Sequence, residues 1–382
     1  MLGPNMRAII LAAGEGSRLR PLTADRPKPM IRVANKPIAQ HVVEALVAHG
    51  VKDITFVVGY QKEKVQSHFQ DGRRFGARVS YAFQPVLSGT ADALLAAPRP
   101  TEPFLVLGAD NLVDGALVKR ILGAPGEGAA LAVHACGTPG RYGVVTLEGD
   151  RIASIEEKPA QPRSGWVSTG VYRFAPEDYD RLRKLRAAGA DGLPDLIQSL
   201  LSRGAPVEAV RTEDLWADAV YPWDLLRVQA EVVRRTSPAT PVVENVSIER
   251  GVMLGDEVSV GAYTTLGRNT CVGSNVVIGG HSTLENCIVL DDAQIGPYSY
   301  LKNTVIGAGA IVGPRFTAVS GACEPRTADG HHALADFGSV VGQDARVGAC
   351  VTLAPGTILG NRVRVALGKT LAGTVEDGAI IL

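Results

Sequence analysis

The stretch LAAGEGSRLRPLTADRPKP, from Leu11 to Pro29, decides how the N-terminal half of the chain is read. It directly follows the apolar run Ala8–Ile10, which predicts a buried strand. In open α/β sheets, ligands bind where loops leave the carboxyl ends of the strands. Glycines in such a loop let backbone N–H groups approach phosphate oxygens, and Arg18 and Lys28 would supply positive charge. The stretch therefore predicts a site for a phosphorylated ligand.

Two familiar phosphate-binding motifs do not fit this loop. Gly14 and Gly16 begin a G-x-G-x-x-G pattern, but Leu19 stands at the third glycine position, so a dinucleotide fingerprint fails. The G-K-[ST] triplet of a P-loop is also missing from the stretch. What remains is a glycine-rich loop followed by Lys28, which is held between two prolines.

Apolar segments rich in β-branched residues alternate with amphipathic segments through residues 1–236. Short connections between alternating strands and helices predict an α/β domain with a Rossmann-like, mostly parallel sheet covered on both faces. We expect a nucleotide-binding arrangement of this kind to occupy residues 1–236. Strands are expected at 7–13, 53–59, 77–83 and 103–110, and helices at 37–50, 62–69, 90–97 and 222–236.

The C-terminal part has a repeat of a different kind. Five glycines, each preceded by an apolar residue, stand six residues apart at Gly255, Gly261, Gly267, Gly273 and Gly279. Helices repeat at about 3.6 residues and strands at about 2, so neither explains this spacing. Hexapeptide repeats are typical of a left-handed parallel β-helix whose apolar residues point into the coil. We expect a linker and the start of the coil at 237–250, the β-helix at 251–382, and an extruded loop at 314–337, where the period breaks.

Composition excludes several classes of protein. Lys plus Arg and Asp plus Glu each number 39, so the formal net charge is zero, and we expect neither a nucleic-acid nor a membrane partner. No apolar run reaches the length of about eighteen residues that a transmembrane helix needs. The five cysteines are scattered without a CxxC pair, which favours a reducing, cytoplasmic setting over a disulfide framework or a zinc ribbon.

The opening stretch also resembles a known family. GEGSRLRPLTADRPKP, residues 14–29, fits the signature G-x-G-[ST]-R-L-x-P-L-T-x-x-x-P-K-P of sugar-1-phosphate nucleotidylyltransferases at every defined position. The resemblance implies that Arg18 and Lys28 bind the triphosphate. It further implies that a glutamine and a Gly-Thr backbone read the base. The nucleotide-binding residues implied in this way are Leu11, Ala12, Ala13, Gly14, Gly16, Ser17, Arg18, Gln84, Gly89 and Thr90.

Further motifs carry the resemblance along the rest of the first domain. LGADN (107–111) and LWADAVYPWDLL (215–226) are similar to the segments that hold the family's metal ion, and imply Asp110 and Asp218 as ligands of Mg²⁺. In the second segment Ala219 and Val220 replace the family's usual glycine. RYGVV, EEKP and VSTGVYRF resemble the sugar-phosphate segments, with Lys158 on the phosphate. The residues implied there are Gly143, Glu157, Lys158, Thr169 and Gly170.

The implied reaction is attack by a sugar-1-phosphate oxygen on the α-phosphorus of a nucleoside triphosphate, with pyrophosphate leaving. The attacking oxygen is already ionised, so positioning and charge neutralisation carry the chemistry and no general base is needed. A unit charge about 4 Å away contributes roughly 4 kcal/mol at an effective dielectric near 20. The resemblance implies UTP or dTTP as donor, and glucose 1-phosphate or N-acetylglucosamine 1-phosphate as acceptor. The catalytic residues implied are Arg18, Lys28, Asp110 and Lys158.

A nucleotidylyltransferase domain followed by a β-helix leaves three alternatives. The archaeal-type bifunctional enzymes, which the chain resembles, also acetylate glucosamine 1-phosphate with acetyl-CoA. Pro297 stands where their histidine is expected, although His331 and His332 could substitute. A guanylyltransferase of the GDP-mannose type is the second alternative. A non-catalytic, NDP-sugar-binding regulatory subunit is the third, and the retention of Lys158 argues against it. In each case the β-helix implies a homo-oligomer, a trimer or a multiple of one.

Overall fold

The computed structural model describes residues 6–327 and 329–382 of the chain. Two compact units divide it, and they interleave along the sequence. We call them the sheet unit and the β-helix unit, and each is described by itself. The sheet unit contains the chain up to Glu15, Pro27–Met30 and Ile38–Asp218, and the β-helix unit contains Gly16–Arg26, Ile31–Pro37 and Ala219–Leu382.

A nine-stranded sheet in the order β5-β4-β1-β6-β11-β8-β12-β10-β9 forms the centre of the sheet unit. The pairings β5–β4, β4–β1, β1–β6 and β8–β12 are parallel. The remaining pairings are antiparallel, so the predicted parallel arrangement holds for the first four strands and the whole sheet is mixed. The strands are β1 (Arg7–Ala12), β4 (Asp53–Val58), β5 (Arg78–Phe83), β6 (Phe104–Gly108), β8 (Ala130–Ala135), β9 (Gly143–Glu148), β10 (Arg151–Glu157), β11 (Trp166–Phe174) and β12 (Glu208–Thr212).

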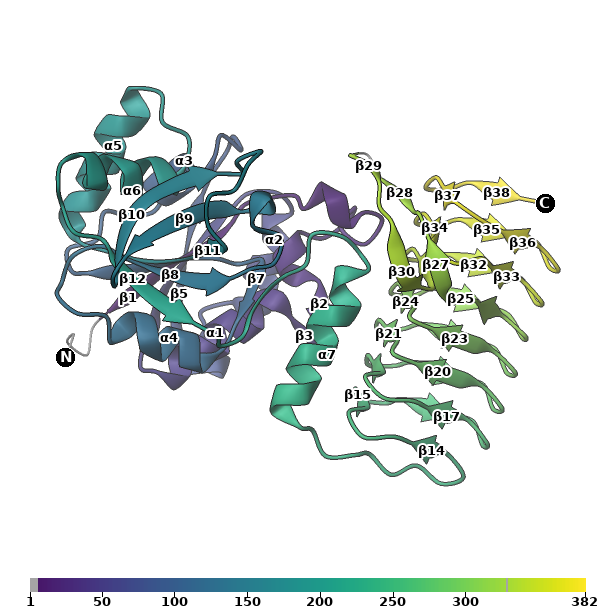
Figure 1. Ribbon diagram of the computed structural model, residues 1–382. Helices are drawn as coiled ribbons and strands as arrows, with labels where there is room; N and C mark the ends of the chain where they lie inside the picture. Colours follow the sequence, from purple (N-terminus) through teal and green to yellow (C-terminus); the bar gives the residue numbers. More distant parts are fainter. Residues whose placement is uncertain (1–5, 328) are drawn as a thin grey trace. The chain divides into compact units, whose positions relative to one another are not determined.

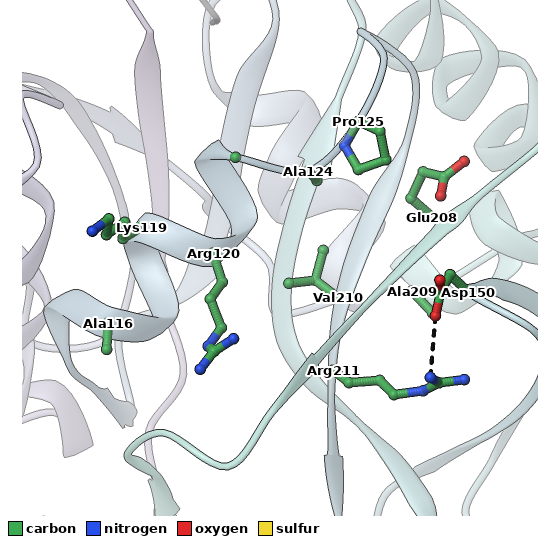
Figure 2. Close-up of a pocket in the computed structure, with 11 residues that line it drawn as sticks. Ala116, Lys119, Arg120, Ala124, Pro125, Asp150, Glu208, Ala209, Val210 and Arg211 are labelled. Atoms are coloured by element: carbon green, nitrogen blue, oxygen red, sulfur yellow. Dashed lines mark hydrogen bonds and ion pairs between the residues drawn. The ribbon is translucent and has the colours of Figure 1, made fainter.

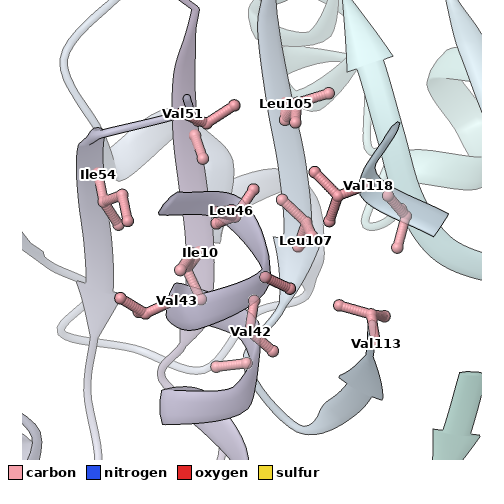
Figure 3. Close-up of a cluster of buried hydrophobic side chains, with 14 of the residues drawn as sticks. Ile10, Val42, Val43, Leu46, Val51, Ile54, Leu105, Leu107, Val113 and Val118 are labelled. Atoms are coloured by element: carbon pink, nitrogen blue, oxygen red, sulfur yellow. The ribbon is translucent and has the colours of Figure 1, made fainter. Parts of the chain in front are cut away.

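Helices cover both faces of this sheet, because successive strand residues point to opposite sides. On β1, Ile10 packs into the cluster beneath one set of helices and Ile9 into the cluster beneath the other. Figure 3 shows the first cluster, where Leu46 and Val43 of α1 meet Ile10 of β1. The first set is α1 (Ile38–Ala48), α2 (Lys62–Phe69) and α4 (Gly115–Leu122), and the second is α3 (Thr90–Ala96), α5 (Pro176–Ala187) and α6 (Leu193–Ser202).

The expected elements of the first domain form within one or two residues of their predicted bounds. The strand predicted at 103–110 ends two residues earlier, at Gly108. Asp110 therefore lies in the turn after β6 and not in the strand itself. The backbone there must turn toward β7 (Asn111–Val113), which pairs antiparallel with β13 (Trp216–Asp218) in a separate two-stranded sheet.

The C-terminal part is a parallel β-helix, as the six-residue period predicts. Successive coils stack on one another, and their short strands form three seven-stranded parallel sheets. Paired residues such as Ser247 and Thr265 lie one coil apart. Figure 1 shows the short strands repeating along this unit. One sheet contains β14 (Ser247–Ile248), β17 (Thr265–Leu266), β20 (Thr283–Glu285), β23 (Tyr300–Lys302), β26 (Thr317–Ala318), β33 (Thr352–Leu353) and β36 (Thr370–Leu371). The second contains β15 (Met253–Leu254), β18 (Cys271–Val272), β21 (Ile288–Val289), β24 (Val305–Ile306), β31 (Ser339–Val341), β34 (Thr357–Leu359) and β37 (Thr374–Val375). The third contains β16 (Ser259–Val260), β19 (Val277–Ile278), β22 (Gln294–Ile295), β25 (Ile311–Val312), β32 (Arg346–Val347), β35 (Arg364–Val365) and β38 (Ile380–Ile381).

The repeat has a direct physical cause in the packing of one coil on the next. The apolar residues of the repeat point inward, and Leu266, Val272 and Ile278 are almost completely buried. The glycine that follows each of them lies against the next coil. A Cβ atom on Gly261 would lie 2.3 Å from the backbone nitrogen of Gly280, so a larger residue does not fit.

The predicted extruded loop exists but begins later than expected. Residues Thr317–Ala318 still form a strand of the coil, because Phe316 and Ala318 are buried in its interior and Ala318 pairs with Leu301, although Val319 stands where the repeat has glycine. The chain leaves the coil only after Val319, whose N–H donates to Leu353 O. We call residues 320–337 the hairpin excursion. It contains β27 (Gly321–Cys323) paired antiparallel with β30 (Leu334–Phe337), and β28 (Arg326–Thr327) paired with β29 (Gly330–His331).

Segments that precede the coil in the sequence complete the β-helix unit. The helix α7 (Asp224–Thr236) buries Gln229, whose amide donates to Asn269 O at 2.7 Å. Asn35, in the turn between β2 (Arg32–Val33) and β3 (Lys36–Pro37), donates to Val272 O at 2.8 Å. No helix in the described part of the chain is long and apolar enough to span a bilayer.

Candidate functional site

The carboxyl ends of four neighbouring parallel strands meet at one edge of the sheet unit. The end of β1, and with it the start of the following loop, lies beside the end of β6, because the N–H of Ala109 donates to Leu11 O at 2.9 Å. It also lies beside the end of β4, because the N–H of Tyr60 donates to Ala13 O at 3.1 Å. The predicted nucleotide-binding segment Leu11, Ala12, Ala13 and Gly14 therefore occupies the edge where open α/β sheets bind ligands.

Lys28 and the two predicted metal-binding aspartates form one cluster at this edge. Lys28 Nζ lies 3.0 Å from Asp110 Oδ2 and 2.6 Å from Asp218 Oδ1. Asp218 reaches the cluster because β13 pairs with β7 and sets Asp218 opposite Asn111, the residue after Asp110. A Cβ on Gly108 would lie 2.8 Å from Asp110 Oδ1, so a larger residue there would require the carboxylate of Asp110 to shift.

The electrostatics of the cluster keep Lys28 charged. Burial disfavours the ammonium form, but the carboxylates of Asp110 and Asp218 outweigh it and raise the pKa of Lys28 above its ordinary value. Only 11% of the lysine side chain is exposed, whereas 43% of Asp110 is. Within residues 6–327 and 329–382 no set of three or more His, Cys, Asp or Glu side chains is grouped to bind a metal. The two carboxylates thus offer a partial set of oxygen ligands that a substrate and water would have to complete.

The cluster continues into the predicted sugar segment through residues that the sequence interpretation did not select. Asn111 Nδ2 donates to Thr169 O at 3.3 Å, and Trp216 Nε1 donates to the same oxygen at 2.9 Å. Thr169 and Gly170 lie at an irregularity in the pairing of β11 with β8, and Gly170 has a φ of 73°. Asn111 directly follows Asp110, and Trp216 stands two residues before Asp218. This closeness to the predicted metal-binding aspartates is the only feature of the sequence that indicates them.

The other sugar-phosphate residues form a second group at the end of β10. Glu157 stands opposite Gly143 in the β9–β10 pairing, and a Cβ on Gly143 would lie 3.1 Å from Glu157 Oε2. Lys158 follows in the left-handed region at φ 44°, with its N–H donating to Tyr142 O and its Nζ lying 3.5 Å from Glu157 Oε1. The lysine side chain is 59% exposed. This group therefore presents a long, exposed lysine side chain and a carboxylate beside the backbone of a glycine.

The predicted base-reading residues lie at the end of β5. Gln84 is buried, and its amide nitrogen donates to Gly89 O at 3.2 Å. Gly89 precedes α3 with a φ of 101°, and a Cβ there would lie only 2.1 Å from Asp191 O. Thr90 begins α3, and its Oγ1 accepts the N–H of Leu193 at 3.0 Å.

The rest of the signature belongs to the β-helix unit. Gly16, at φ 73°, begins the single-turn helix Ser17–Leu19, and its carbonyl accepts the hydroxyl of Thr23 at 2.9 Å. Arg18 is exposed, and its Nε lies 3.0 Å from Oδ2 of Asp329 in the hairpin excursion. Gly16, Ser17 and Arg18 thus belong to the β-helix unit, whereas Lys28 belongs to the sheet unit.

A surface hollow of about 660 Å³ lies elsewhere on the sheet unit, beside α4 and β12 (Figure 2). Its charged lining is already paired in part, with Arg211 Nη1 3.1 Å from Asp150 Oδ1 and Arg120 bonded to Asp214. None of the site residues predicted from the sequence lines it. The candidate site is therefore the open edge of the sheet and not this hollow.

Comparison with known proteins agrees with the fold and identifies the family. Residues 7–234 match the nucleotidyl transferase family model, and residues 238–324 match the GMPPB C-terminal domain. The chain therefore belongs to the nucleotidyl transferase family. The nucleotidylyltransferase class and the α/β-plus-β-helix fold predicted from the sequence are confirmed.

Individual relatives differ in how much of the chain they share. The bifunctional protein GlmU of Methanocaldococcus jannaschii is 32% identical over 65% of this chain and 60% of its own length. The UTP–glucose-1-phosphate uridylyltransferase AglF of Haloferax volcanii is 35% identical over 62% of this chain and all of its own length. GlmU of Methanococcus maripaludis is 28% identical over 98% of this chain and 97% of its own. A solved structure described as a glucose-1-phosphate thymidylyltransferase of Bacillus anthracis has a TM-score of 0.55 and 28% identity, covering 59% of this chain and 94% of that one.

Proposed function

We propose that the protein transfers the nucleotidyl group of UTP or dTTP to a hexose 1-phosphate, either glucose 1-phosphate or N-acetylglucosamine 1-phosphate, and releases pyrophosphate. Family membership supports nucleotidyl transfer. The substrate class is supported by two relatives whose names specify a glucose-1-phosphate uridylyltransferase and a glucose-1-phosphate thymidylyltransferase. The pyrimidine preference is supported by the same two names, and by the resemblance that implies Gln84 and the Gly89–Thr90 backbone as the groups that read the base.

The observation that carries the proposal is the cluster of Lys28 with Asp110 and Asp218. In the reaction, a phosphate oxygen of the sugar forms a bond to the α-phosphorus while the bond to the bridging oxygen of pyrophosphate breaks. Two anions must approach each other as negative charge gathers on the leaving group. A buried, permanently charged lysine at a ligand-binding edge opposes that repulsion before the substrates arrive.

We further propose that Asp110 and Asp218 hold Mg²⁺ together with phosphate oxygens. The donor chemistry fits, since Mg²⁺ prefers a few carboxylates and keeps water or phosphate in its remaining positions. When bound, the ion would neutralise charge on the phosphates. Asp110 is half exposed, so its carboxylate is open to a ligand from solvent.

Lys158 and Glu157 are proposed to bind the acceptor. Lys158 is exposed and reaches a phosphate as a flexible point charge, which suits the sugar phosphate. Glu157 and the Gly143 backbone offer hydrogen-bond acceptors or donors for sugar hydroxyls. Thr169 is proposed to line the sugar site, because its carbonyl already accepts from Asn111 and Trp216 and its hydroxyl donates to Ala132 O. On the donor side, Gly16, Ser17 and Arg18 are proposed to bind the triphosphate as part of the same signature.

A panel assay tests the proposal. Purified protein with Mg²⁺ would be given each of five nucleoside triphosphates with each sugar 1-phosphate, and pyrophosphate release would be measured. We expect UTP or dTTP with a hexose 1-phosphate to give the highest rate, and Asp110→Asn to lower it by about a hundredfold. Asp256→Asn, an exposed carboxylate of the β-helix, serves as the control. Full activity of Asp110→Asn, or activity with GTP alone, would overturn the assignment.

A second activity is supported by one observation, the match of a bifunctional relative over both units. Acetyl-CoA consumption with glucosamine 1-phosphate would test it. His332 is packed against Tyr221 with its Nε2 2.9 Å from Thr327 Oγ1, while His331 is exposed.

The β-helix is also proposed to assemble the chain into a homo-oligomer, which light scattering of the purified protein would measure.

A further inference from the structure

The hairpin excursion carries an acidic residue at its tip. The antiparallel stem of β27 and β30 continues into the shorter pair β28 and β29, which ends in the turn that contains Asp329. In Figure 1 this hairpin projects from the stacked strands of its unit. The excursion interrupts the coil, whose strands before and after it still pair directly, as β24 does with β31 and β26 with β33.

The tip is held firmly within its own unit. The ring of His332 lies 4.3 Å from that of Tyr221 and 5.4 Å from that of Trp223. Trp223 in turn stacks on Tyr221 at 4.8 Å and contacts Phe337 at 5.9 Å. Four aromatic rings thus join the excursion to the segment that leads into α7. Such packing fixes the position of the turn.

The Asp329 carboxylate is fixed by several donors. Its Oδ1 accepts the hydroxyl of Thr327 at 2.6 Å, and its Oδ2 accepts the hydroxyl of Tyr221 at 2.7 Å. Hydrogen bonds from Thr327 and Tyr221 lower the pKa of Asp329, so the group is ionised at neutral pH. Asp329 Oδ2 also accepts the Nε–H of Arg18 at 3.0 Å.

This contact leaves most of the Arg18 guanidinium available. Arginine has five N–H donors in a planar fork, and the contact uses only the one on Nε. No described residue accepts a hydrogen bond from either terminal nitrogen of Arg18, and the side chain is 57% exposed. Phosphates are bound by arginine through such parallel terminal donors. A guanidinium already held in place loses less freedom when it binds its ligand.

We propose that Asp329 is a positioning residue for nucleotide binding, because it holds the guanidinium of Arg18 through Nε and leaves both terminal nitrogens for the triphosphate. The inference rests on the proposed function, in which Arg18 binds the nucleoside triphosphate. It adds that the hairpin excursion of the β-helix sets the affinity for the donor nucleotide.

The sign of the effect distinguishes positioning from simple electrostatics. Removing a negative charge near a polyanion would tighten binding if Asp329 only repelled the nucleotide or competed for Arg18. If Asp329 positions Arg18, its removal weakens binding instead. Isothermal titration of UTP and dTTP would measure the Kd with no need for catalysis, and steady-state kinetics would give the KM for each substrate.

We expect Asp329→Asn to raise the nucleotide Kd and KM by about three- to tenfold, with the KM for the sugar 1-phosphate unchanged. Asp329→Glu should recover part of the loss. Glu324→Gln removes the same charge from an exposed position of the excursion and should change nothing. In an Arg18→Ala background, Asp329→Asn should have no further effect, because it acts through Arg18.

A Kd that is unchanged or lower in Asp329→Asn would overturn the inference, and so would an equal effect in the Arg18→Ala background. Failure of the proposed function would look different, since the wild-type protein would then release no pyrophosphate with any substrate pair. Thermal unfolding of each variant identifies a loss of structure. Partial recovery of nucleotide affinity in Asp329→Glu identifies a specific role for the carboxylate.

Discussion

Two cations of one sixteen-residue signature, residues 14–29, are held in opposite ways. Lys28 is buried in the sheet unit between two carboxylates, whereas Arg18 is exposed in the β-helix unit and bonded to one carboxylate. A buried charge is screened little, so its interactions are strong and its removal leaves partners unpaired. An exposed charge interacts weakly and depends on geometry. The difference teaches that one continuous motif can combine a buried electrostatic centre with an exposed cation that a carboxylate remote in the sequence holds in place.

The largest effect is expected when Lys28 is replaced by methionine. Lys28→Met removes the buried charge but keeps most of the side-chain length, and it takes away the ammonium group that contacts both Asp110 and Asp218. We expect kcat/KM for pyrophosphate release to fall on the order of a hundred- to a thousandfold. Lys52→Met, at an exposed position, is the control. A loss below tenfold would mean that the buried cation is not central.

A smaller effect is expected at Arg18. Arg18→Ala removes hydrogen bonds to charged oxygens at an exposed site, so the nucleotide Kd should rise by about ten- to a hundredfold. Arg18→Lys should fall between the wild type and Arg18→Ala, because lysine keeps the charge but lacks the fork. Titration of the nucleotide would measure both, with Arg250→Ala as an exposed control. A loss at Arg18 equal to that at Lys28 would remove the contrast between them.

The smallest effect is expected at Tyr221. Tyr221→Phe removes one hydrogen bond to Asp329 and keeps the ring packing, so Thr327 still holds the carboxylate. We expect the nucleotide Kd to rise by about two- to fourfold. Tyr263→Phe, on an exposed turn of the β-helix, should have no effect. An effect larger than that of Asp329→Asn would show that the hydroxyl acts by another route.

Local sequence patterns were enough for most of the fold. The apolar run of β1 and the helical stripe of α1 formed within two residues of expectation, because both depend on burial of near neighbours. The six-residue period predicted the β-helix, since each turn of the coil repeats the same contacts between an inward apolar residue, a glycine and the next coil. The excursion begins later than its predicted start, because Phe316 and Ala318 continue to fill the interior of the coil after the glycine period has ended.

The site was only partly accessible to the same reasoning. Asp110 and Asp218 were identified through a resemblance, and the structure brings them to one lysine. Asn111 and Trp216 were missed, because an amide and an indole carry no charge that sequence patterns would single out. Asp329 was missed as well, since an acidic residue in a loop is ordinary until its partner is known.

The sequence by itself determined the two architectures and the charged groups available for phosphates, because secondary structure and coil packing depend on residues close in the chain. Only the tertiary structure decided which carboxylate each cation meets. Lys28 bonds to a residue 190 positions away and Arg18 to one 311 positions away. Such pairs form when remote strands and hairpins are brought together by burial of apolar surface, and no local pattern records where their polar ends will lie.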